Sequence, residues 1–100
     1  MQILVSGRHL EIEDSLKEYA RDKVQKLTKF YDRIQSIEVV YDHEAGKPSV
    51  EVIVNTEPKN TFVGHEMGED MFAVTDTVVD KLERQLTRHK EKHRNRKHPQ

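Results

Sequence analysis

The first third of the chain changes its hydrophobic period from a strand pattern to a helix pattern. Residues 2–6 are rich in aliphatic and β-branched side chains, which predicts a short strand that Gly7 ends. Apolar positions then recur every three or four residues as far as about Tyr31, which predicts a helix. Its buried face would hold Leu16, Tyr19, Ala20, Val24, Leu27, Phe30 and Tyr31.

The first residue of this helix has several candidates, and one lysine interrupts its apolar face. Ser15 and Glu18 have the spacing of a capping box, and Glu13 or Asp14 are alternative caps. Lys23 falls inside the apolar arc of the helix. A lysine in such a position usually lays its aliphatic stem on apolar surface and keeps its ammonium group at the rim.

After residue 33 the hydrophobic period changes to two. The alternation of apolar and polar side chains predicts strands over residues 37–42, 50–55 and 61–66. Glycine and proline mark turns at 44–48 and 57–60 between these strands. Both turns are short enough for hairpins.

The last third of the chain, residues 69–97, predicts a long helix, with Arg94, Arg96 and Lys97 beyond the helix end that the pattern supports. On a helical wheel its apolar face holds Met71, Thr75, Val78, Val79, Leu82 and Leu86. A basic stripe runs beside that face at three- and four-residue spacing and comprises Lys81, Arg84, Arg88 and Lys92. Beyond Leu86 the apolar positions pass to histidine and lysine, so the first half should anchor the helix and the second half should be cationic.

The element order β-α-β-β-β-α predicts an α+β two-layer sandwich with a four-stranded mixed sheet. The first strand reaches the second only through a helix, so this pair should be parallel with a right-handed crossover. Both helices should then pack on one face of the sheet. Gly64 lacks a side chain, which would let a helix lie close to the fourth strand.

Composition and length indicate one small domain. The 100 residues are 34% apolar and 35% charged, a polar composition that can still form a hydrophobic core. We assign residues 1–93 to the domain and 94–100 to a basic, flexible tail. The absence of cysteine suits a reducing cytoplasm. No apolar run approaches the roughly 20 residues of a membrane span.

The net charge of −1 hides a strong asymmetry along the chain. Residues 1–80 contain 9 basic and 16 acidic side chains, whereas residues 81–100 contain 8 basic and 2 acidic ones. The first segment therefore carries −7 and the second +6. Such a dipole favours an oriented, polyanionic partner at the basic end.

The candidate chemistry favours binding over catalysis. No carboxylates stand as a pair near a basic or nucleophilic residue at a spacing that implies a site, and no nucleophile motif or glycine-rich phosphate loop is present. We therefore expect no enzyme activity and no cofactor. His89 and His93 have metal-ligand spacing, but without a nearby third ligand they are more simply explained as solvated residues of a basic segment.

The basic stripe is the strongest functional signal, although most charge runs are merely solvated helix faces. Glu83 and Glu91 are the only acidic residues after Asp80, so the cations are largely not neutralised within their helix. Lys23 and Lys26 add charge where the first helix should neighbour the second. Together the helices would form a groove that matches a phosphate backbone, which favours a nucleic acid over an acidic protein or an anionic membrane.

Several motifs of the chain resemble a known family. Asp76, the run Asp80-Lys81-Leu82 and the run Arg84-Gln85-Leu86 closely resemble the second helix of the ribosome hibernation-promoting factors, also called ribosome-associated inhibitors or sigma-54 modulation proteins. Further matching residues are Asp70, Met71, Phe72, Ala73, Arg88, Lys90 and Lys92, and, in the first strand and helix, Ile3, Val5, Gly7, Glu11, Ile12, Leu16, Lys23, Lys26, Leu27 and Phe30. The chain resembles a short, single-domain member.

This resemblance implies a β-α-β-β-β-α fold and a cytoplasmic protein, monomeric off the ribosome and without membrane attachment. Family members bind the small ribosomal subunit and its rRNA in the channel used by mRNA and by the anticodon ends of tRNAs. They silence translation in stationary phase or stress, and a helper protein is a further partner in ribosome dimerisation. The implied rRNA contacts are Lys23, Lys26, Lys81, Arg84, Arg88, Lys90 and Lys92.

Two departures from the family pattern and two alternative functions stay open. Glu13 replaces a usual threonine cap, and Glu66 stands where a small residue is usual. The older family name suggests a protein-binding transcription regulator. A general double-stranded RNA-binding module has a comparable layered fold, with contacts spread over about 16 base pairs.

Overall fold

The structure is a computed structural model that describes residues 1–57 and 59–96, apart from the side chains of residues 92–96. Its elements follow the predicted order, with a short 3₁₀ helix added after the first helix. They are β1 (Gln2–Gly7), α1 (Asp14–Gln25), η1 (Lys26–Lys29), β2 (Ile34–Glu44), β3 (Lys47–Thr56), β4 (Asn60–Met67) and α2 (Met71–Arg96). The predicted α+β class is confirmed.

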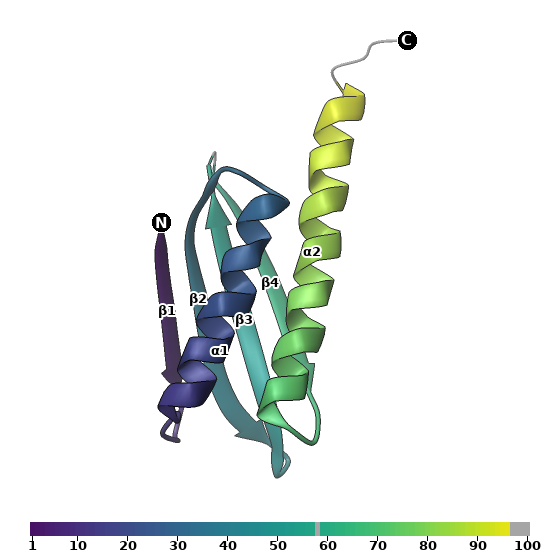
Figure 1. The fold of residues 1–100 in the computed structure, drawn as a ribbon. Coiled ribbons are helices and arrows are strands. Elements are labelled where there is room, and N and C mark those ends of the chain that lie inside the picture. Colours follow the sequence, from purple (N-terminus) through teal and green to yellow (C-terminus); the bar gives the residue numbers. More distant parts are fainter. Residues whose placement is uncertain (58, 97–100) are drawn as a thin grey trace.

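The strands form one mixed sheet in the order β1-β2-β3-β4. β1 pairs parallel with β2, and the other two pairs are antiparallel hairpins. Both helices cover the same face of the sheet and leave the other face open, and α2 extends beyond the end of the sheet (Figure 1). The predicted two-layer sandwich with two helices on one face is confirmed.

The core lies between the sheet and the two helices, and α1 contributes Leu16, Ala20 and Val24 to it. The predicted apolar positions of α2 all pack on this core, although Met71 is only half-buried, and Val74 joins them at 4% exposure. Gly64 on β4 allows the close contact, since a Cβ at this position would lie 2.9 Å from Val78 Cγ2 and 3.2 Å from Leu82 Cγ. The role expected of Gly64 is therefore confirmed.

A buried hydroxyl pair crosses the core between β2 and α2. Thr75 donates a hydrogen bond to the Met71 carbonyl oxygen at 2.7 Å. Its hydroxyl also contacts the Tyr41 hydroxyl, which must then be the donor of that second bond. Both side chains are fully buried, and burial raises the pKa of Tyr41. This pairing explains how a threonine and a tyrosine fit a core of valine and leucine.

The first helix differs from the prediction at both ends. Asp14 is its first residue and Glu13 its cap, so the capping box proposed for Ser15 and Glu18 is wrong and the alternative at Glu13 is right. The α-helix ends at Gln25 rather than near Tyr31 and continues as η1. The Thr28 hydroxyl donates to the Gln25 carbonyl oxygen at 2.8 Å, which supports the tighter turn.

The β2–β3 turn is shorter than predicted. Glu44 pairs with Lys47, so only Ala45 and Gly46 form the turn, and both have positive φ values of 52° and 79°. Two residues with positive φ match the twist of a hairpin, which lets the strands extend further on either side.

Helix α2 runs to Arg96, so residues 94–96 of the segment predicted as a tail have helical backbone. Residues 97–100 lie outside the described residues, and the flexibility of the segment stays a prediction. Among the described helices, none combines the length and the apolar character that crossing a membrane requires.

Candidate nucleic-acid interface

Two of the cations predicted to bind RNA form ion pairs on opposite flanks of α2, Lys81 with a residue of β4 and Lys23 with a residue of α2 itself. Lys81, Arg84 and Arg88 follow one another at three- and four-residue spacing and therefore share a flank. Lys81 pairs with Glu66 of β4, and the Gln85 amide on the same flank donates to the Val63 carbonyl oxygen at 3.2 Å. Lys81 thus lies on the side of α2 that faces β4, and Arg84 lies about 60° further around the helix, on the side away from the sheet.

The second ion pair lies on the side of α2 that faces α1. The ammonium group of Lys23 is 3.2 Å from Asp76 Oδ1 on α2. Lys26 follows at the start of η1 and is exposed. Lys90 is 14 residues after Asp76, which returns the helix to within about 40° of the same direction. Arg84 is eight residues after Asp76 and therefore lies about 80° from it around the helix, so a groove that unites Lys23 with the basic stripe stays a prediction.

We call these six residues the basic surface: Lys23, Lys26, Lys81, Arg84, Arg88 and Lys90. The backbone of Lys92 continues the helix, but its side chain lies outside the described part of the structure. Five of the six are exposed, and Lys23 is half-buried. Lys23 takes the rim position expected for it. Whether it also contacts RNA stays a prediction.

A three-residue network fixes Lys23 between the helices. The Tyr19 hydroxyl donates to Asp76 Oδ1 at 2.6 Å, and the Lys23 ammonium group lies 5.6 Å from the centre of the Tyr19 ring. The Tyr19 ring also packs edge-to-face on Phe72 of α2, with 5.1 Å between ring centres. Asp76 thus joins α1 to α2 and positions the Lys23 ammonium group.

The protonation equilibria of the three groups follow from this network. The hydrogen bond from Tyr19, reinforced by Lys23, lowers the pKa of Asp76. The hydrogen bond to Asp76 raises the pKa of Tyr19, and the contact with Asp76 likewise raises the pKa of Lys23. At neutral pH the network therefore contains a carboxylate, an ammonium group and a neutral phenol.

Glu66, noted as a departure from the family pattern, also acquires a structural role. It lies at the end of β4 on the face covered by the helices, where its side chain is 20% exposed and pairs with Lys81. A small residue in this place would leave Lys81 without that carboxylate. The sequence pattern alone did not identify this partner.

His89 packs against two aromatic rings. Its ring lies 5.1 Å from that of Phe62 and 5.8 Å from that of Tyr31, centre to centre. The aromatic contacts extend the packed face of α2 one turn beyond Leu86. Within the described residues, no three histidine, cysteine, aspartate or glutamate side chains gather closely enough to hold a metal ion. The side chain of His93 lies outside that part.

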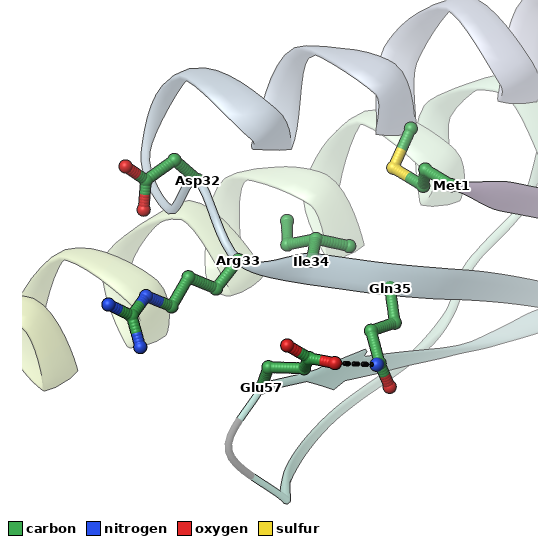
Figure 2. Close-up of a pocket in the computed structure, with 6 residues that line it drawn as sticks. All are labelled: Met1, Asp32, Arg33, Ile34, Gln35 and Glu57. Carbon is green, nitrogen blue, oxygen red and sulfur yellow. Dashed lines mark hydrogen bonds between the residues drawn. The ribbon is translucent and has the colours of Figure 1, made fainter.

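A pocket of about 560 Å³ opens at the end of the sheet near the start of β2. Figure 2 shows Asp32 and Arg33 extending from the loop before β2, while Gln35 and Glu57 point toward one another and share a hydrogen bond. Met1 and Ile34 complete the lining. Its charged side chains have mixed signs, so the pocket does not extend the basic surface.

Comparison with known proteins places the chain in a family. Residues 3–94 match the family described as "Sigma 54 modulation protein / S30EA ribosomal protein". The chain is 37% identical over 92 residues to the "Ribosome hibernation promoting factor" of Azotobacter vinelandii, which covers 92% of this chain and 85% of that protein. It is 35% identical to the protein of the same name from Escherichia coli K12, covering 92% and 96%.

Solved structures agree with the sequence comparison. A "ribosomal subunit interface protein" from Coxiella burnetii superimposes with a TM-score of 0.83 at 26% identity, over 91% of this chain and 99% of that one. The N-terminal domain of Thermus thermophilus Protein Y gives a TM-score of 0.78 at 33% identity, over 89% and 99%. The resemblance noted in the sequence is confirmed, and the chain belongs to the Sigma 54 modulation protein / S30EA ribosomal protein family.

Proposed function

We propose that this protein binds the small ribosomal subunit through its basic surface and silences translation in stationary phase or stress. The observation that carries the proposal is the exposed pair Arg84 and Arg88, for which the described structure contains no ion pair. Relatives named for ribosome hibernation and a structural neighbour named for the ribosomal subunit interface support the ribosome as the partner.

The chemistry of the basic surface suits an rRNA backbone. Arginine presents a planar fork of donors that can grip a phosphate through two hydrogen bonds, and two such forks lie one helical turn apart at Arg84 and Arg88. Lys26 and Lys90 add cations on the other flank. We propose that this arrangement occupies the channel used by mRNA and by tRNA anticodon ends, as a binding protein without catalysis. We further propose that the protein is cytoplasmic and that it is a monomer when it is not bound to the ribosome.

Salt-dependent binding to isolated small subunits tests the proposal. With about five to seven phosphates contacted, the logarithm of affinity should fall against the logarithm of salt concentration with a slope of about −4 to −6. Subunits already loaded with mRNA and tRNA should bind the protein much more weakly than empty subunits. A slope near zero would contradict the electrostatic mechanism, and equal binding to any double-stranded RNA would favour a general RNA-binding module.

A further inference from the structure

Two carboxylates each hold one cation of the basic surface. On the flank facing α1, Asp76 accepts from both Lys23 and Tyr19. On the flank facing β4, Glu66 pairs with Lys81. Both paired cations lie toward the first half of α2, where the helix packs on the sheet. On each flank, the cation nearest the core is therefore neutralised by a carboxylate of the protein: Lys23 by Asp76 and Lys81 by Glu66.

The remaining members of the basic surface differ in this respect. In the part of the chain that the structure describes, Lys26, Arg84, Arg88 and Lys90 form no ion pair with a carboxylate. A flexible polyanion can contact these four cations directly. To contact Lys23 or Lys81 as well, its phosphate must displace a carboxylate that is already in place.

We propose that Asp76 and Glu66 determine the RNA selectivity of the basic surface by competing with phosphate for Lys23 and Lys81. The proposal rests on the proposed RNA-binding function of that surface. A disordered strand has to lose its own flexibility to displace either carboxylate, and it gains only one phosphate contact in return. Asp76 resists displacement further, because the Tyr19 hydroxyl holds it as well. The carboxylates thereby weaken binding to RNAs that lack a fitted surface.

Binding to poly(U), measured by fluorescence anisotropy at several salt concentrations, tests this role on an unstructured strand. Glu66→Gln and Asp76→Asn keep the side-chain size and remove the charge. Each variant should bind poly(U) about threefold to tenfold more tightly, and its salt slope should steepen by about 0.7 because one further phosphate is contacted. Thermal melting of each variant establishes that the fold is retained.

A double-mutant cycle separates direct competition from a general change in charge. In a Lys81→Gln background, Glu66→Gln should no longer steepen the slope, because no cation is released. Asp80→Asn is the matched control, since it also removes one negative charge, at an exposed residue of α2 for which the described structure contains no ion pair. Its slope should equal that of the wild type. An Asp80→Asn slope as steep as that of Glu66→Gln, or a Glu66→Gln gain that survives without Lys81, would overturn the proposal.

Parallel titrations with small ribosomal subunits complete the test. Both variants should lose selectivity, so that the ratio of subunit affinity to poly(U) affinity falls at least about threefold. Unchanged poly(U) binding in both variants would overturn the role of the carboxylates whatever the subunits do. Wild-type protein that fails to bind subunits would overturn the proposed function instead, and the poly(U) cycle would still decide whether the two carboxylates compete with phosphate.

Discussion

The two halves of α2 use the same helical geometry for different purposes. In the first half, side chains such as Val78 pack on the sheet, and Asp76 forms an ion pair with α1. In the second half, among the side chains that the structure describes as far as Glu91, Leu86 and His89 continue the packed face. The exposed side chains there are mainly cations, and Arg84 and Arg88 stand one turn apart with like charge.

This difference shows how a helix can carry charges that do not favour its own folding. Like charges four residues apart destabilise an isolated helix by about 0.2–0.5 kcal/mol per pair. The anchoring half offsets this cost, because each fully buried leucine or valine contributes about 1.5–3 kcal/mol. Folding and binding therefore depend on different residues of one helix, and substitutions should separate them.

The largest expected effect concerns the anchor. Leu82 is fully buried against Gly64, and Leu82→Ala should lower the free energy of unfolding by about 2–5 kcal/mol because it leaves a cavity. Thr87→Ala, at an exposed position on the same helix, should change it by less than about 0.5 kcal/mol. Urea denaturation followed by circular dichroism measures both, and equal losses would show that the first half of α2 is not the anchor.

The next largest effect should lower the affinity for the ribosome and leave the stability of the fold unchanged. Arg84→Glu combined with Arg88→Glu should lower the affinity for small subunits at least about 100-fold, since two phosphate contacts become repulsions. The melting temperature should stay near that of the wild type, because both side chains are exposed. Lys17→Glu with Lys59→Glu makes the same change in net charge outside the basic surface. If this control weakens binding as much, total charge and not the basic surface governs the interaction.

The sequence predicts best which residues share a face of α2. Helical spacing places Leu82 on the apolar face and Arg84 on the basic stripe whatever the tertiary structure is. Which neighbour each flank meets depends on how α2 packs between α1 and β4. The contact between Tyr19 and Asp76 joins residues 57 positions apart, and no local pattern specifies it.

His89 and Glu66 illustrate the same limit at single residues. Both residues are polar, and the sequence around each predicts no packing partner. His89 is interpreted there as a solvated residue, and Glu66 as a departure from the family pattern. The structure gives His89 two aromatic neighbours, from β4 and from the loop after η1, and gives Glu66 a lysine from α2. Pairing with distant elements decided both roles, and only the tertiary structure reveals such pairs.

A smaller effect tests the hydroxyl pair beneath the anchoring half. Tyr41→Phe removes the donor to Thr75 while the ring stays in the core, and it should lower the free energy of unfolding by about 0.5–1.5 kcal/mol. Affinity for small subunits should not change. A loss well above that range, measured in urea, would show that the hydroxyl does more than satisfy Thr75.

The smallest effect is the pH dependence that Asp76 introduces between α1 and α2. The pKa of Asp76 is lowered in the folded protein, so its contribution to stability is present above the ordinary carboxyl pKa and disappears as the pH falls below about 4. The pKa values of Tyr19 and Lys23 are raised, so their contributions are present below about pH 10 and disappear as the pH rises further. Contact with Asp76 is the largest cause of both raised values.

Asp76→Asn should therefore flatten the stability profile at both extremes of pH. Asp80→Asn is the control: Asp80 acts on Lys23 only weakly, so this variant should keep the wild-type profile at both extremes. Melting temperatures recorded from pH 3 to pH 11 would show the difference, and parallel profiles for wild type and Asp76→Asn would mean that the network does not contribute to holding the helices together.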